Sequence, residues 1–163
     1  MTTAHDSGFW NWILEKRLAF GRRLSSGTDA DSLHRAGFTT ILDLDQTNKD
    51  AEAAWARKGS LRYLADHRDK IEEKFQAIPI EKLERLANRI GKVLEDETET
   101  LYVHCEAGWG RSPTVVAAYL ILRGRTLAEA ERLVQDDRES IWEGIDRNYR
   151  ENLEALARKP HHL

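Results

Sequence analysis

Short apolar runs alternate along this chain with longer segments in which apolar residues recur every three or four positions. The runs predict four strands, at 18–21, 39–44, 61–65 and 100–103. The helical spacing predicts six helices, at 29–36, 48–58, 80–94, 112–122, 128–134 and 145–156. Because strands alternate with helices, we expect an α/β domain with a central, mostly parallel sheet of four to five strands, flanked by helices on both faces.

The segment before the first predicted strand is rich in aromatic residues, among them Phe9, Trp10 and Trp12. We expect these rings to cover one edge of the core, with contact to a membrane surface as the alternative. The length is that of one domain, so residues 1–163 are predicted to form a single unit. The polar ends, 1–8 and 159–163, are expected to be mobile.

Composition and charge narrow the class of protein. Hydrophobic residues make up 40% of the chain and charged residues 33%, which is typical of a soluble globular protein. The formal net charge is -3 and no basic stripe is present, so nucleic acid is not an expected partner. No apolar run reaches the ~18 residues that a membrane span needs. A single cysteine, with no signal-peptide pattern in residues 1–8, predicts a cytoplasmic location, and we expect a monomer.

The single cysteine, Cys105, directly follows the last predicted strand and lies six positions before Arg111. A helix is predicted to begin near Ser112, with Pro113 in its first turn, where proline fits well. Ligands of open α/β sheets bind beyond the carboxyl ends of the strands. The loop from Cys105 to Arg111 therefore occupies the position at which an active site is expected.

The residues of this loop suit a bound phosphate group. Gly108 and Gly110 let successive backbone N–H groups turn toward an anion, and the helix N-terminus adds further N–H groups. The planar guanidinium of Arg111 can hold two phosphate oxygens at once. The same positive surroundings favour the thiolate form of Cys105, which would be nucleophilic at neutral pH. A buried structural cysteine is the alternative, but it leaves the following arginine and glycines unexplained.

The stretch His104-Cys105-x-x-Gly108-x-x-Arg111-Ser112 resembles the signature of cysteine-dependent protein tyrosine phosphatases, and its continuation resembles the compact dual-specificity branch. The resemblance covers most of the chain and implies a dual-specificity phosphatase-like fold, with hydrolysis through a phosphocysteine on Cys105. It also implies that Ser112 helps the sulfur to leave and that His104 braces the loop. It implies neither a metal nor another cofactor. The residues implied to bind the phosphate are Glu106, Ala107, Gly108, Trp109, Gly110 and Arg111.

The family also uses an aspartate from an upstream loop to protonate the leaving group. Two candidates, Asp66 and Asp69, follow the strand predicted at 61–65, and they lie 39 and 36 positions before Cys105. Both intervals are longer than is usual in the family, and 70–77 resembles an insertion. Asp69 fits the spacing better, whereas Asp66 is followed by His67 as in some family members. We therefore predict Asp69 as the general acid, with Asp66 as the alternative.

The loop carries no lysine, although family members that act on phosphoinositides tend to have lysines there. Glu106 would repel a multiply charged inositol ring, and Trp109 offers an apolar wall to an aryl group or a peptide. The expected substrate is therefore a phosphorylated protein, through phosphotyrosine, or another simple phosphomonoester. A lipid or sugar phosphate is the alternative. Two other functions are weaker: a catalytically silent phosphate-binding module, and a rhodanese-like sulfur transferase, whose pattern fits this loop poorly.

Overall fold

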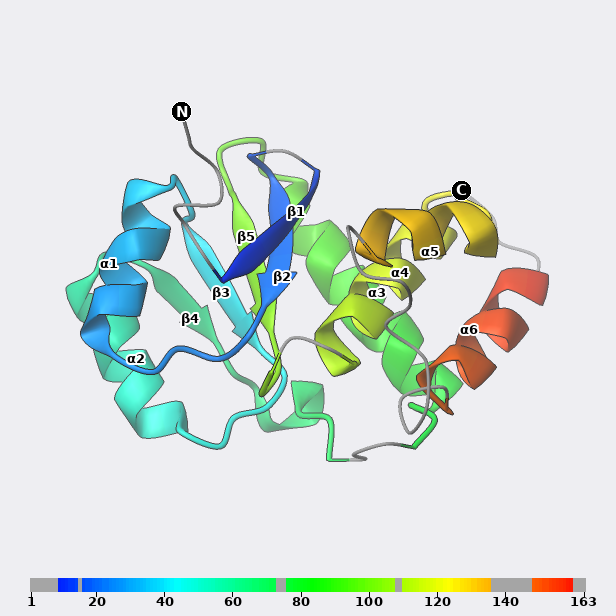
Figure 1. Cartoon of the computed structure of the whole chain (residues 1–163), viewed down its shortest axis with the longest axis horizontal. Helices are drawn as coiled ribbons and strands as arrows, with labels where there is room; N and C mark the ends of the chain where they lie inside the picture. The colour runs from blue at the N-terminus through cyan, green and yellow to red at the C-terminus, as the bar shows by residue number, and fades with distance from the viewer. Residues whose placement is uncertain (1–8, 15, 73–75, 108–109, 136–147, 160–163) are drawn as a thin grey trace.

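The computed structural model describes residues 9–14, 16–72, 76–107, 110–135 and 148–159 of the 163-residue chain. A five-stranded sheet with the order β1-β2-β5-β3-β4 runs through its centre (Figure 1). β2, β5, β3 and β4 are parallel to one another, and β1 pairs antiparallel with β2. The mostly parallel sheet predicted from the sequence is confirmed. The strands are β1 Trp10–Leu14, β2 Leu18–Gly21, β3 Thr40–Asp43, β4 Arg62–Leu64 and β5 Leu101–His104.

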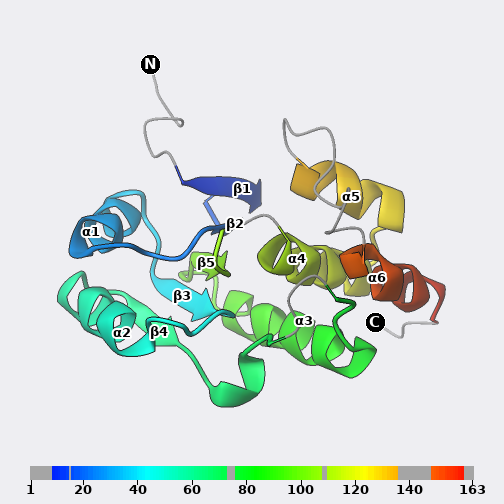
Figure 2. The same cartoon turned by 60° about the horizontal axis from the view of Figure 1, so that its bottom comes forward.

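Helices cover both faces of the sheet, as predicted (Figures 1 and 2). α1 and α2 lie on one face, and α3, α4, α5 and α6 lie on the other. In the part of the chain that is described, no helix is long and apolar enough to cross a membrane. The bounds are α1 Gly27–Arg35, α2 Lys49–Lys58, α3 Ile80–Leu94, α4 Arg111–Leu122, α5 Leu127–Gln135 and α6 Tyr149–Arg158.

Each predicted helix is present to within a few residues, apart from the start of the last. The predicted start of that helix, 145–147, lies outside the described residues, as do the ends 1–8 and 160–163 for which mobility is expected. Lys159, the first residue of the expected C-terminal tail, is described, and its Nζ lies 3.0 Å from Glu84 Oε2 on α3.

The aromatic N-terminal segment forms an edge strand that the sequence did not predict. Its rings do pack on one core, as expected: Trp12 stacks on Phe38 with a centroid distance of 4.7 Å. The next side chain, Ile13, packs on the other core, because alternate residues of a strand point to opposite faces. With apolar groups on both faces, the segment lacks the alternation of apolar and polar residues by which half-buried strands are recognised.

α4 is the central helix of the larger core. All its residues from Arg111 to Ile121 are buried, and it packs against α3, α5 and α6. The amphipathic α3 turns its buried side chains toward this core, and they are Leu83, Leu86, Ala87, Ile90 and Val93. A helix buried on every side is held firmly in place, so the N-terminus of α4 is a rigid support for whatever precedes it.

Candidate active site

The carboxyl ends of three neighbouring strands lie in register at one edge of the sheet. Gly21 at the end of β2 pairs with His104 at the end of β5, and His104 pairs in turn with Asp43 at the end of β3. The chain segments that follow these strands are also joined, because Arg23 N donates to Glu106 O at 3.0 Å. Residues just beyond β2, β3 and β5 therefore meet around Cys105.

Cys105 is the first residue of the segment 105–111, which joins β5 to α4 and includes the first residue of that helix. We call it the phosphate-binding loop, after the role that the sequence predicts for it. Its side chain is buried, with only 2% of its surface exposed. The backbone N–H of Ser112 donates to the sulfur at 3.4 Å, and Ser112 Oγ lies 3.3 Å from it. The sulfur is thus held against the N-terminus of α4, where it accepts one of the N–H groups that have no partner within the helix.

Arg111, the first residue of α4, turns its guanidinium toward three acceptors from other segments. Nη1 donates to Ile71 O at 2.9 Å, and Nη2 lies 3.4 Å from Asp45 Oδ1 and 3.9 Å from Glu106 Oε1. Its side chain is 7% exposed. A guanidinium has five N–H donors, so these contacts orient the group and leave further N–H groups for a ligand.

A second arginine, Arg23, shares both carboxylates with Arg111. Arg23 Nη1 lies 3.3 Å from Asp45 Oδ2, and Nη2 lies 3.9 Å from Glu106 Oε2. Burial raises the pKa of Asp45, but a hydrogen bond from Thr47 and the charges of the two arginines more than offset this, so the pKa lies below its ordinary value. Arg23 and Asp45 follow β2 and β3 and belong to no local motif. Only the register of the strands brings them to the loop.

The described part of the loop places Glu106 and Ala107 at the surface, with the Glu106 side chain 42% exposed. Gly110 is buried beneath the ring of Tyr149 from α6, and a Cβ at this position would lie only 2.5 Å from a ring carbon. Glycine is therefore required here by the close approach of α6. The predicted phosphate-binding residues Gly108 and Trp109 lie outside the described residues.

His104 lies directly behind the cysteine and is fully buried. Its Nδ1 is 2.9 Å from Cys105 O, and because a carbonyl can only accept, Nδ1 carries the hydrogen. Its Nε2 lies 2.8 Å from Glu52 Oε1 on α2 and 3.7 Å from Asp43 Oδ1. The role of His104 as a brace stays a prediction, and these contacts agree with it. Its partner Glu52 lies 52 positions earlier in the chain, on α2, where no local pattern marks it.

The buried group of Asp43, Glu52 and His104 has the donor types of a metal site. The 2.8 Å between His104 Nε2 and Glu52 Oε1 is the distance of a close ion pair, although Nε2 makes no hydrogen bond to a described residue. A tetrahedral zinc with bonds of ~2.0–2.1 Å would hold the two atoms about 3.3 Å apart. Burial lowers the pKa of His104, but the two carboxylates outweigh it and raise the pKa to about 9. The arrangement therefore fits an imidazolium between carboxylates.

Asp69 is completely buried and lies between two arginines of α3. Its Oδ1 accepts from Arg85 Nε at 3.2 Å and its Oδ2 accepts from Arg89 Nε at 3.0 Å. Both carboxylate oxygens thus have arginine partners. The assignment of Asp69 as the general acid stays a prediction. In the structure this carboxylate joins the segment 66–72 to α3 through Arg85 and Arg89.

Asp66 caps the short 3-10 helix His67–Asp69 by accepting from Arg68 N at 2.9 Å. The Arg68 guanidinium also donates to it, and this hydrogen bond is the main cause that holds the pKa of Asp66 well below its usual range. Farther along the same segment, Glu72 is exposed and has no hydrogen bond or ion pair with any residue that the structure describes. It directly follows Ile71, whose carbonyl accepts from Arg111.

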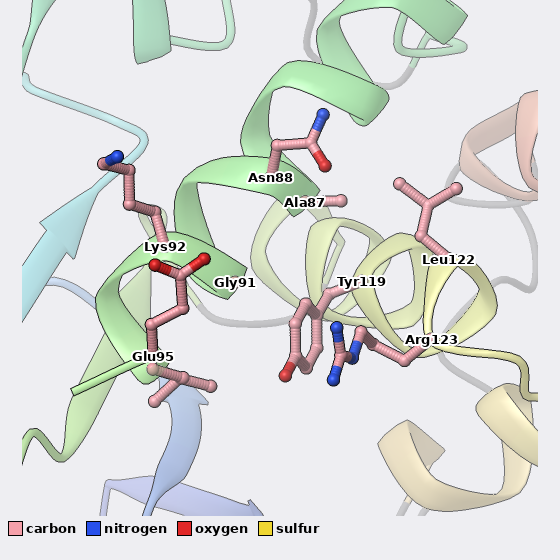
Figure 3. A pocket seen from close by; sticks show the side chains of 9 residues that line it. Ala87, Asn88, Gly91, Lys92, Glu95, Tyr119, Leu122 and Arg123 are labelled. Atoms are coloured by element: carbon pink, nitrogen blue, oxygen red, sulfur yellow. The ribbon is translucent and has the colours of Figure 1, made fainter. Parts of the chain in front are cut away.

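A pocket of about 390 Å³ lies elsewhere, between the C-terminal halves of α3 and α4 (Figure 3). Its lining includes Asn88 and Lys92 of α3 and Tyr119 of α4, with Arg123 just beyond that helix. The rise of ~1.5 Å per residue along α4 separates its last turn from the phosphate-binding loop by more than about 12 Å. The pocket shares no residue with the site around Cys105.

The chain matches the model of the family described as "Dual specificity phosphatase, catalytic domain" over residues 24–155. It is also 30% identical over 146 residues to the amyloplastic phosphoglucan phosphatase of Castanea sativa. That match covers 85% of this chain and 39% of the relative, so the chain spans less than half of the relative's length. With a strand, cysteine loop and helix arranged as described above, the chain belongs to the dual specificity phosphatase family.

Solved structures agree with this fold. Tk-PTP in its active form is 24% identical and superposes with a TM-score of 0.76, with coverage of 94% of this chain and 99% of that one. PTPMT1 in complex with PI(5)P is 18% identical, with a TM-score of 0.63 and coverage of 91% and 99%. At these identities the likeness establishes the fold alone.

Proposed function

We propose that this chain is a phosphomonoester hydrolase that forms a phosphocysteine on Cys105. The observation that carries the proposal is the position of the sulfur, which accepts the Ser112 N–H at the start of α4 and is followed six residues later by the buried guanidinium of Arg111. Transfer of a phosphoryl group requires a nucleophile and an anion-binding group, and both lie here at one rigid helix N-terminus.

In the first step the Cys105 thiolate attacks phosphorus, an S–P bond forms and the P–O ester bond breaks. The leaving oxygen keeps the electron pair of that bond and takes a proton from a general acid. Charge on the equatorial oxygens is stabilised by loop N–H groups and by Arg111. In the second step water attacks phosphorus and gives a proton to the same carboxylate, while sulfur leaves as a thiolate that the Ser112 hydroxyl stabilises.

Three carboxylates of the segment 66–72 compete for the role of general acid, and the contacts favour Glu72. Asp69 and Asp66 are each bonded to arginine side chains and so are engaged within the protein. Glu72 is exposed, and it follows Ile71, whose carbonyl orients Arg111. The Glu72→Gln variant is expected to lose about 10²-fold in kcat toward an alkyl phosphate, because this leaving group needs the proton. Toward nitrophenyl phosphate, whose phenolate leaves readily, it should lose little. Steady-state kinetics on both substrates measure the difference.

Asp69→Asn, Asp66→Asn and Glu73→Gln are the matched controls, and each is expected to affect both substrates alike. If Asp69→Asn or Asp66→Asn shows the selective loss while Glu72→Gln does not, the general acid is the aspartate predicted from the sequence. A selective loss in Glu73→Gln alone would contradict all three assignments.

For the substrate we propose a phosphorylated protein or another simple phosphomonoester, with phosphotyrosine as the leading case. The carboxylate of Glu106 lies 3.9 Å from both the Arg111 and the Arg23 guanidinium groups, so its negative charge partly neutralises their positive charges. A substrate with one phosphate needs only the groups around the sulfur. A polyphosphorylated inositol ring would meet the Glu106 carboxylate without a lysine to offset it.

A phosphorylated glucan is the second candidate, and it is favoured by the similarity to the phosphoglucan phosphatase of Castanea sativa over 85% of this chain. The direct experiment compares kcat/KM of the full chain for nitrophenyl phosphate, a phosphotyrosine peptide, a phosphorylated glucan and a phosphoinositide, with thiosulfate as the sulfur-transfer control. We expect hydrolysis of the aryl and peptide phosphates. A preference for the glucan would establish the second candidate, and absence of hydrolysis of every monoester would contradict the proposal.

A further inference from the structure

Glu52 is a buried carboxylate on a helix that contributes nothing else to the site. It lies in α2 and is fully buried, whereas Asp50 in the same helix is exposed. Its Oε1 is 2.8 Å from His104 Nε2 and accepts the backbone N–H of Leu24 at 3.3 Å. A carboxylate is costly to bury without charged partners, so its position calls for a specific explanation.

The two contacts of Glu52 connect it to the two segments that lie around Cys105, namely the loop after β5 and the residues after β2. His104 donates from Nδ1 to Cys105 O, the first carbonyl of the phosphate-binding loop. Leu24 follows Arg23, whose own N–H donates to Glu106 O in the same loop. One carboxylate from the opposite face of the sheet thus joins the loop after β5 to the segment after β2.

The other charged and titratable groups that face His104 already have partners. Asp43 of β3 lies 3.7 Å from Nε2, but its Oδ1 accepts the N–H groups of Asp45 and Gln46, and its Oδ2 accepts the hydroxyl of Tyr63 from β4. The hydroxyl of Tyr102, on β5, donates to Arg22 O. Glu52 is therefore the closest carboxylate to the imidazole, and the two form an ion pair at 2.8 Å. Among the described residues, neither Glu52 Oε2 nor His104 Nε2 makes a hydrogen bond.

We propose that Glu52 is a positioning residue of this site: it holds His104 as an imidazolium in one orientation, and through the Nδ1–H bond to Cys105 O it fixes the peptide at which the phosphate-binding loop begins. The effect on catalysis rests on the proposed phosphatase function, but the effect on His104 does not. Residues that orient a reacting group matter because a displacement of about 1 Å can cost about 10²-fold in rate.

The protonation of His104 gives a direct readout. Its pKa is raised from 6.5 to about 9, so the ion pair stabilises the folded chain fully below pH 6.5, and the contribution is lost as the pH rises through about 9. Glu52→Gln keeps the size of the side chain and removes the charge. We expect the titration midpoint of His104, followed by NMR of the ring, to fall toward its ordinary value.

The same variant is expected to lose about 10- to 100-fold in kcat for nitrophenyl phosphate, with a smaller change in KM. Asp50→Asn, an exposed carboxylate on the same helix, should match the wild type in both measurements. Because Glu52 acts through His104, its substitution in a His104→Asn background should cause little further loss of kcat.

An unchanged His104 midpoint in Glu52→Gln would overturn the proposal, even if kcat fell, because a lower rate alone would reflect a structural defect. If Glu52→Gln does not fold, Glu52→Asp decides. That variant keeps the charge but moves it one methylene away from His104. We expect a lower His104 titration midpoint and a partial loss of kcat. A midpoint equal to that of the wild type would again overturn the proposal. If the wild type hydrolyses no phosphomonoester, the proposed function fails, while the titration still tests Glu52.

Discussion

The Cys105→Ser variant is expected to hydrolyse nitrophenyl phosphate at least about 10⁴-fold more slowly than the wild type, because a neutral hydroxyl replaces the sulfur nucleophile. The phosphate-binding loop should stay in place. Its supports are the His104 contact to the Cys105 carbonyl and the burial of α4, and neither involves the sulfur atom. The variant is therefore expected to bind vanadate or phosphate with nearly wild-type affinity, measured by calorimetry.

The combination of lost turnover and retained anion binding is what assigns the chemistry to Cys105. Loss of both would mean that the loop had collapsed. Turnover near that of the wild type would contradict a phosphocysteine mechanism outright, since the chain has no other cysteine.

The Arg111→Lys variant is expected to lose about 10²- to 10³-fold in kcat/KM for the same substrate, although the positive charge is kept. The guanidinium donates to Ile71 O and lies beside Asp45 Oδ1, and a planar fork can hold these acceptors and still present N–H groups to a phosphoryl oxygen. An ammonium group at the end of a shorter, flexible chain cannot do both. Steady-state kinetics at fixed ionic strength measure the loss.

Arg62→Lys is the control for this substitution. Arg62 is the first residue of the edge strand β4, and its side chain is 56% exposed. It is in register with Thr40 and Leu101, the first residues of β3 and β5, so it lies at the opposite end of the strands from Cys105. It should keep the wild-type kcat/KM. If Arg111→Lys also kept it, the charge alone would be sufficient and the bidentate role of Arg111 would be wrong.

The parts of the site that could be predicted from the sequence are those that are close together in the chain. Cys105, Arg111 and Ser112 lie in one strand–loop–helix unit, so local pattern and glycine positions were enough to place them around a sulfur at a helix N-terminus. The four parallel strands were predicted for the same reason, because each is a short apolar run followed by a polar segment or a helix.

Residues brought in from other segments could not be predicted in this way. Asp45 and Arg23 reach the loop because Gly21, His104 and Asp43 are in register across three strands, and register is a property of the folded sheet. Asp69 was predicted from the sequence as the general acid, and nothing in the sequence indicated that it is buried. Its burial depends on two arginines one helical turn apart on α3, which only the packing of that helix reveals.

The pairing of Arg23 and Arg111 with Asp45 and Glu106 has a consequence for how substrate is attracted. Two positive and two negative side chains cancel, so these four residues set up little field beyond the first layer of solvent. A phosphate dianion is then selected at contact distance, by replacing carboxylate oxygens as the partner of the guanidinium groups. Asp45 and Glu106 therefore pair with the two arginines when no phosphate is bound. We expect this pairing to weaken the binding of other anions at the same position.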